Sequence, residues 1–189
     1  QKFEKDTFEA IDQGISLNPI LQSFQEVVNQ YHIEKELISA FLYSMEMDLD
    51  SITFDRSKYE EYIYGSAEVI GLMCLRVFVN GNNEEYERLK EPAKKLGAAF
   101  QKVNFLRDIQ SDYEDRGRVY FPSVDFQQFS CVEKREIEDE IESDFQEALE
   151  GIKGLPKGAR LGVHLAYLYY QRLLKRIKKY TAADVVKQR

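Results

Sequence analysis

Residues 101–122 read QKVNFLRDIQSDYEDRGRVYFP, and this stretch combines two kinds of helix face. Phe105, Leu106 and Ile109 have the spacing of side chains that pack against a core. A second face spans about 80° at 100° per residue and carries only amides and carboxylates: Gln101, Asn104, Asp108 and Asp112. Carboxylates next to core residues are costly to bury unless something pairs with them. The stretch therefore predicts a packed helix with a polar site along one side.

The polar face offers oxygen ligands for a hard cation. Asp108 and Asp112 lie one helical turn apart, and Asn104 lies one turn earlier. Mg²⁺ suits such donors because it keeps several waters and bridges to substrate phosphates. We therefore expect Mg²⁺, with Mn²⁺ as an alternative, at these three residues, and we expect Gly97 to leave room beside them. The plain alternative is a solvated helix end, since D-x-x-x-D also arises by chance in an acidic chain.

Arginines surround this face. Arg107 lies beside the aspartates, and Arg116 and Arg118 follow at the predicted helix end. Cations at a helix C-terminus interact favourably with the helix dipole, whereas an arginine fork also matches phosphate oxygens. The pattern alone leaves both interpretations open.

Composition indicates one globular domain. The chain has 189 residues with 43% hydrophobic and 31% charged side chains, which suits a single domain over residues 1–189. The net charge of −7 makes general nucleic-acid binding a poor fit. The longest apolar run, residues 69–79, contains Arg76 and is too short to span a membrane. Cys74 and Cys131 have no metal-binding spacing and are expected to be reduced thiols in a cytoplasmic protein.

Apolar spacing and capping residues predict helices almost throughout. Residues 57–79 should form a central helix, and residues 154–160 should form a turn. Pro92 should break or kink the helix over 84–117, and Gly117 is expected to be the residue just past the end of that helix. Ser130 and Glu133 form a capping-box pattern, and Thr181 is expected to cap a short last piece. The other expected helices cover residues 18–31, 33–49, 130–153 and 161–180. The fold class predicted is one all-α bundle.

The quoted stretch resembles the second aspartate-rich motif of the squalene and phytoene synthase family, roughly N-x-x-R-D-x-x-x-D followed by R-x-Y-[LF]-P. The matching positions here are Asn104, Arg107, Asp108, Asp112, Arg118, Tyr120, Phe121 and Pro122. Gln101 falls where the family has a glutamine. Weaker resemblances in the same order occur at SMEMDL (44–49), YIYGSAEVIG (62–71) and YQRLLKRI (170–177), so the resemblance runs from about residue 37 to the end.

The resemblance implies an isoprenoid-synthase helical bundle around a central cavity, incomplete at both ends. It implies head-to-head joining of two prenyl diphosphates, geranylgeranyl or farnesyl, through a cyclopropylcarbinyl diphosphate to a C40 or C30 hydrocarbon. Mg²⁺ would stabilise the leaving diphosphate, and an apolar cavity would exclude water. Small residues, namely Gly65, Ser66, Ala67 and Gly71, are expected to leave space for the chains.

The resemblance also implies roles for individual residues. Catalytic roles fall to Arg107, Arg118 and Tyr62. Substrate contacts fall to Gln101, Asn104, Arg116, Tyr120, Tyr170 and Arg189. For the tyrosines, ordinary core packing is the competing interpretation. NADPH is not indicated as a cofactor, because the sequence carries no nicotinamide-binding fingerprint.

One departure bears on function. The family has a first aspartate-rich motif upstream of the segment that resembles residues 37–49, and residues 1–36 contain no match. The chain is therefore expected to be a fragment, inactive by itself, or a degenerate homologue. Rival functions are a non-catalytic relative acting in assembly of respiratory complexes and a plain helical interaction domain. Peripheral membrane association would suit an apolar product. The sequence does not decide whether this product is phytoene, dehydrosqualene or squalene, and it does not decide the oligomeric state.

Overall fold

The computed structural model describes residues 2–49, 54–122 and 124–186, and these are helical with no strand among them. The helices are α1 (Lys2–Gln13), α2 (Pro19–Tyr31), α3 (Lys35–Met47), α4 (Arg56–Ile63), the π-helix η1 (Tyr64–Glu68), α5 (Val69–Phe78), α6 (Asn83–Arg116), the 3₁₀-helix η2 (Phe126–Gln128), α7 (Cys131–Gly154), α8 (Lys157–Ile177) and α9 (Ala182–Val185). The predicted all-α class is confirmed. None of these helices is long and apolar enough to cross a membrane.

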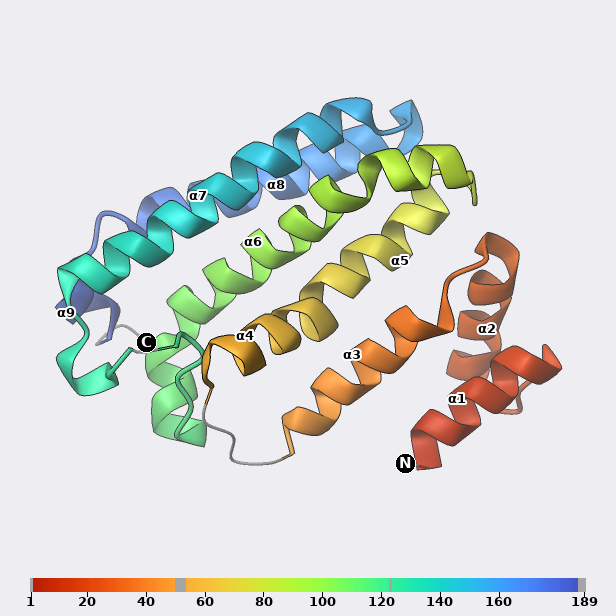
Figure 1. Ribbon diagram of the computed structural model, residues 1–189, viewed down its shortest axis with the longest axis horizontal. Coiled ribbons are helices and arrows are strands. Elements are labelled where there is room, and N and C mark those ends of the chain that lie inside the picture. Colours follow the sequence, from red (N-terminus) through yellow and green to blue (C-terminus); the bar gives the residue numbers. More distant parts are fainter. Residues whose placement is uncertain (1, 50–53, 123, 187–189) are drawn as a thin grey trace.

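The helices α3, α4–α5, α6 and α7 lie side by side, and the α1–α2 hairpin packs at one end (Figure 1). Helix α6 is the centre of this arrangement and contacts η1, α5, α7, α8 and α9. Its 34 residues correspond to a length of about 51 Å. A site on α6 therefore has neighbours from most of the bundle.

Helix α6 continues without a break through Pro92, so of the two predicted effects, a break or a kink, the break is wrong. Proline lacks an N–H and its ring crowds the preceding turn, and tertiary packing compensates for this locally. Gly151 of α7 lies against the ring, since a Cβ on Gly151 would be 2.2 Å from Cβ of Pro92. Beyond the far end of α6, Gly117 takes a left-handed φ of 64°, as its predicted position past the helix end requires.

The residues predicted as one central helix over 57–79 form α4, η1 and α5, which follow one another without a gap. The middle part, η1, is π-helical. Glycines in and near this stretch allow close helix packing. A Cβ on Gly65 would lie 2.5 Å from the Ala40 carbonyl oxygen, and one on Gly97 would lie 2.4 Å from that of Ala67. A neighbouring backbone therefore occupies the place of a side chain at both glycines. The expectation of open room is wrong for Gly65, whereas Gly97 lines the cavity described below.

The predicted side-chain caps occur at the starts of α7 and α9. The capping box of Ser130 and Glu133 is present at the start of α7, and Thr181 caps α9 together with Asp184. The predicted turn over residues 154–160 is too long, because α8 already begins at Lys157. The carbonyl of Pro156 accepts bonds from the Ala159 and Arg160 N–H groups, both at 3.0 Å, so the helix starts directly after this proline.

Candidate functional site

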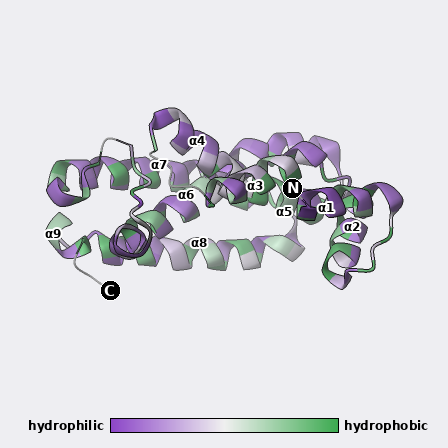
Figure 2. Ribbon diagram, turned by 90° about the horizontal axis from the view of Figure 1, so that it is seen from below, coloured by the Kyte–Doolittle hydropathy of each residue, from purple (hydrophilic) through white to green (hydrophobic). Residues whose placement is uncertain are grey.

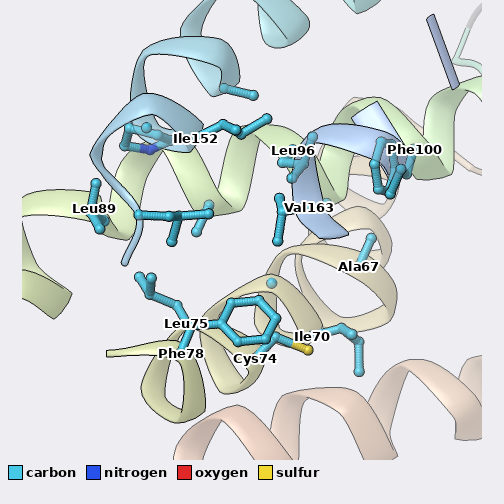
Figure 3. A pocket seen from close by; sticks show the side chains of 18 of the residues that line it. Ala67, Ile70, Cys74, Leu75, Phe78, Leu89, Leu96, Phe100, Ile152 and Val163 are labelled. Carbon is cyan, nitrogen blue, oxygen red and sulfur yellow. The ribbon is translucent and has the colours of Figure 1, made fainter. Parts of the chain in front are cut away.

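An apolar cavity of about 320 Å³ lies between α5, α6, α7 and α8. Figure 3 shows Leu75, Leu96 and Ile152 among the side chains that converge on it. Gly71, Ser66 and Ala67 line it as predicted, whereas Gly65 does not. Lined by aliphatic and aromatic groups, the cavity can hold a hydrocarbon chain and exclude water.

The cavity connects with the polar face of α6 through one residue. Gln101 lines the cavity, and Asn104, Asp108 and Asp112 continue from it toward the C-terminal end of the helix. The Asn104 Oδ1 atom is buried and has no hydrogen-bond partner within the described residues. An unsatisfied buried acceptor is costly, which is what a ligand-binding oxygen shows when its ligand is not bound.

Asp108 is neutralised by its neighbour in sequence. Its oxygens accept bonds from Arg107 Nε at 2.7 Å and Nη2 at 2.5 Å. The Asp108 carboxylate raises the pKa of Arg107, and the nearby Tyr170 and Tyr169 add to this effect. Both side chains are partly exposed, so this pair can reopen toward a phosphate or a metal at little cost.

The donor set fits Mg²⁺. Two carboxylates, Asp108 and Asp112, and the unpaired Asn104 oxygen are hard oxygen donors on one helix face. No cluster of three or more His, Cys, Asp and Glu side chains suited to a metal occurs in the described ranges. Mg²⁺ needs only one or two carboxylates when water and substrate phosphates complete its shell. The residues predicted as metal ligands therefore share a face, and their binding of a metal stays a prediction.

A second cluster forms around Asp48, at the end of α3. Its carboxylate accepts bonds from the Tyr62 hydroxyl at 3.0 and 3.1 Å and from Arg118 Nη1 at 2.8 Å. Arg118 Nη2 also donates to the Asp48 backbone carbonyl at 2.7 Å. Arg118 is only 8% exposed. Asp48 thus joins two predicted catalytic residues from different parts of the chain.

Aromatic packing places this cluster next to the polar face. Tyr120 stacks on Phe105 with ring centroids 4.0 Å apart and an angle of 7°, and Phe105 directly follows Asn104. Burial raises the pKa of Tyr62, and the neighbouring Tyr120 and Asp48 raise it further. Tyr62 is therefore a protonated phenol that donates its hydrogen bond to Asp48.

The charge of Arg118 is also secure. Burial acts to lower its pKa, but the bonds to Tyr120 and Asp48 outweigh burial and the pKa is raised. Its main-chain N–H donates to the Asp112 carbonyl at 3.0 Å. The loop after α6 is thereby tied both to the acidic face and to α3.

The predicted site residues fall into two neighbouring groups. Gln101, Asn104, Arg107, Asp108 and Asp112 lie on α6. Tyr170 of α8 stacks on Phe100, with ring centroids 4.0 Å apart. Tyr62, Arg118 and Tyr120 belong to the Asp48 cluster. Arg189 and the side chain of Arg116 lie outside the described part of the chain. The proposed roles of all these residues stay predictions.

The sequence reasoning did not include Asp48 among the site residues. A signal for it existed, because Asp48 is the aspartate of the SMEMDL segment that carries part of the family resemblance. Nothing within the segment indicates that Asp48 contacts Arg118, which lies 70 residues further along the sequence.

Comparisons with known proteins bear on the family and the fold of the chain. A family model described as squalene/phytoene synthase matches residues 1–189. A 4,4'-diapophytoene synthase from Staphylococcus haemolyticus is 27% identical over 139 residues, covering 73% of this chain and 44% of that protein. A phytoene synthase from Arthrospira platensis is 25% identical over 212 residues, covering 98% of this chain and 67% of that protein.

Among solved structures, squalene synthase HpnC from Alicyclobacillus acidocaldarius superposes with a TM-score of 0.77 at 20% identity. The match covers 94% of this chain and 72% of that one. At this identity the likeness establishes the fold. The matched part spans 44% to 72% of the length of these three proteins.

Proposed function

The chain belongs to the squalene/phytoene synthase family, and on this basis we propose that it binds prenyl diphosphates for their head-to-head condensation. The substrates would be geranylgeranyl or farnesyl diphosphate, and the product a C40 or C30 hydrocarbon formed through a cyclopropylcarbinyl diphosphate. The observation that carries the proposal is the continuity between the apolar cavity and the acidic face of α6, which meet at Gln101.

The two regions suit the two halves of a prenyl diphosphate. The cavity would hold the hydrocarbon chain away from water, which would otherwise quench an allylic cation. The acidic face would hold the diphosphate through Mg²⁺ at Asn104, Asp108 and Asp112. When bound, Mg²⁺ supplies positive charge that stabilises the leaving diphosphate.

The arginines would act at the same end of the cavity. Arg107 donates two bonds to Asp108, and the same two N–H groups can donate to phosphate oxygens instead. Arg118 keeps its charge while held by Asp48. We propose that it contributes positive potential to the departing diphosphate, whose charge grows as the carbon–oxygen bond breaks. Tyr62 and Tyr120 would present aromatic rings beside the same region.

The non-catalytic alternative is less well supported. A relative acting only in assembly has no need for a metal-binding face, yet both aspartates, Asn104 and Arg107 are present here. The Asn104 oxygen, which has no partner within the described residues, is available as a further donor on the same face.

Calorimetry with Mg²⁺ and inorganic pyrophosphate tests the proposal on this chain. We expect binding that requires both components and that Asp108→Asn or Asp112→Asn weakens at least roughly tenfold, because each removes an anionic ligand. Asp139→Asn, an exposed change on α7, is the matched control and should bind as the wild type does. Equal binding by all four proteins, or binding without Mg²⁺, would refute the proposed metal site.

A further inference from the structure

The apolar cavity is closed at the end away from Gln101. Helices α5 and α6 form one hairpin and α7 and α8 form another, and both connections lie at this end of the bundle (Figure 1). Arg88 Nη2, near the start of α6, donates to the Gly154 carbonyl at the end of α7 at 3.0 Å. In the turn between α5 and α6, the Gly81 N–H donates to the Arg76 carbonyl at 2.9 Å. A chain that enters at Gln101 therefore meets a wall built by two hairpins.

Helix α6 gives a measure of the depth of the cavity, and Figure 2 shows how it runs along the length of the bundle. Leu89 and Gln101 line the cavity at opposite ends, and their separation in sequence corresponds to about 18 Å along a helix. An extended prenyl chain advances about 5 Å per isoprene unit, because each unit adds four carbon–carbon bonds. The cavity is therefore about as long as three to four isoprene units, and a side chain at its far end decides whether the last unit fits.

Phe78 is the side chain at that end with the fewest packing constraints. Leu75, Leu89 and Leu155 also line the cavity there, but they are buried members of one core cluster. Phe78 is the last residue of α5 and belongs to none of the core clusters formed by the described residues. Figure 3 shows its ring on the α5 side of the cavity, opposite Leu89 and Ile152. Loss of this ring would leave the wall in place and lengthen the space in front of it.

We propose that Phe78 sets the longest prenyl chain that the cavity accepts. The inference rests on the function proposed above and adds the residue that selects among substrates of that class. A phenylalanine ring is similar in length to one isoprene unit, so its removal admits a chain one unit longer. Each unit that enters the cavity removes five carbons from water, which favours binding. A unit that cannot enter stays in water and adds no affinity.

Calorimetry with unreactive thiolodiphosphates of increasing chain length tests this proposal on the whole chain in the presence of Mg²⁺. The series is geranyl, farnesyl, geranylgeranyl and geranylfarnesyl thiolodiphosphate. We expect the wild-type affinity to rise at least roughly tenfold with each unit up to a limit, and then to stop rising. In Phe78→Ala the limit should move one unit further along the series, while the binding of inorganic pyrophosphate with Mg²⁺ should be unchanged.

Ile70→Ala is the matched control, because Ile70 lines the same cavity from the same helix, about two turns before Phe78. This variant should weaken every analogue that reaches it and leave the limit unchanged, and circular dichroism checks that both variants are folded. An unchanged limit in Phe78→Ala, the same shift in Ile70→Ala, or a wild-type affinity that still rises at the longest analogue would overturn the proposal without touching the proposed function. A wild-type affinity independent of chain length would instead refute the cavity as the site of the prenyl chain, and the proposed function with it.

Discussion

Replacing Asp48 by alanine should destabilise the fold, because this side chain connects α3, α4 and the loop after α6. The change removes the acceptor for the Tyr62 hydroxyl and for Arg118 Nη1. Removing one partner of a buried pair costs about 3–5 kcal/mol. The Asp48 side chain is 29% exposed and that of Arg118 is 8% exposed, so water reaches one side of this pair. We therefore expect a loss of about 2–3 kcal/mol.

Urea and thermal unfolding followed by circular dichroism measure this effect. For a chain of this length the expected loss corresponds to a fall in Tm of roughly 5–10 °C. Asp12→Ala is the matched control, because Asp12 pairs with Lys35 on the surface, with side chains 60% and 47% exposed, and should cost less than about 1 kcal/mol. The reasoning fails if the two variants are equally stable.

A double-mutant cycle identifies which partner of Asp48 matters. Tyr62→Phe removes only the hydroxyl bond, so its effect in the Asp48→Ala background should be smaller than in the wild type. We expect a coupling energy of about 0.5–2 kcal/mol. No coupling would mean that Tyr62 and Asp48 contribute independently.

Three further predictions concern packing, pH and charge geometry. Gly97→Ala should cost about 1–3 kcal/mol by forcing a Cβ against the Ala67 carbonyl, whereas Gly162→Ala, with open space around it, should be neutral or stabilising in the same unfolding assay. Burial acts to raise the pKa of Glu34, but the bond and charge of Arg76, together with a main-chain bond and the charge of Lys90, outweigh it and the pKa is lowered. The stability contributed by the Glu34–Arg76 pair is therefore fully present above the unfolded pKa of Glu34, about 4.3, and is lost as pH falls through the lower folded pKa. The destabilisation by Glu34→Gln should accordingly disappear in acid. A constant difference in the free energy of unfolding between this variant and the wild type from pH 7 to pH 3 would contradict this. Arg118→Lys should lower Tm and weaken pyrophosphate binding, because the Arg118 side chain is 8% exposed and doubly bonded to Asp48. An unchanged Tm would show that these bonds contribute little to stability.

The amino-acid sequence by itself determined the helical class and much of the candidate metal site. Helical periodicity is local, so the stripe of Asn104, Asp108 and Asp112 on one face of α6 follows from residue spacing alone. Capping is local as well, which is why the start of α7 at Ser130 and the end of α6 at Gly117 were predicted. The family resemblance depends on the same short segments and needed no tertiary information.

Only the tertiary structure decided which distant segments meet. Arg118 bonds to Asp48 because the loop after α6 folds back to the end of α3, and no pattern within either segment encodes that pairing. The glycines show the same limit: the sequence does not distinguish Gly65, which packs against the Ala40 backbone away from the cavity, from Gly97, which lines the cavity.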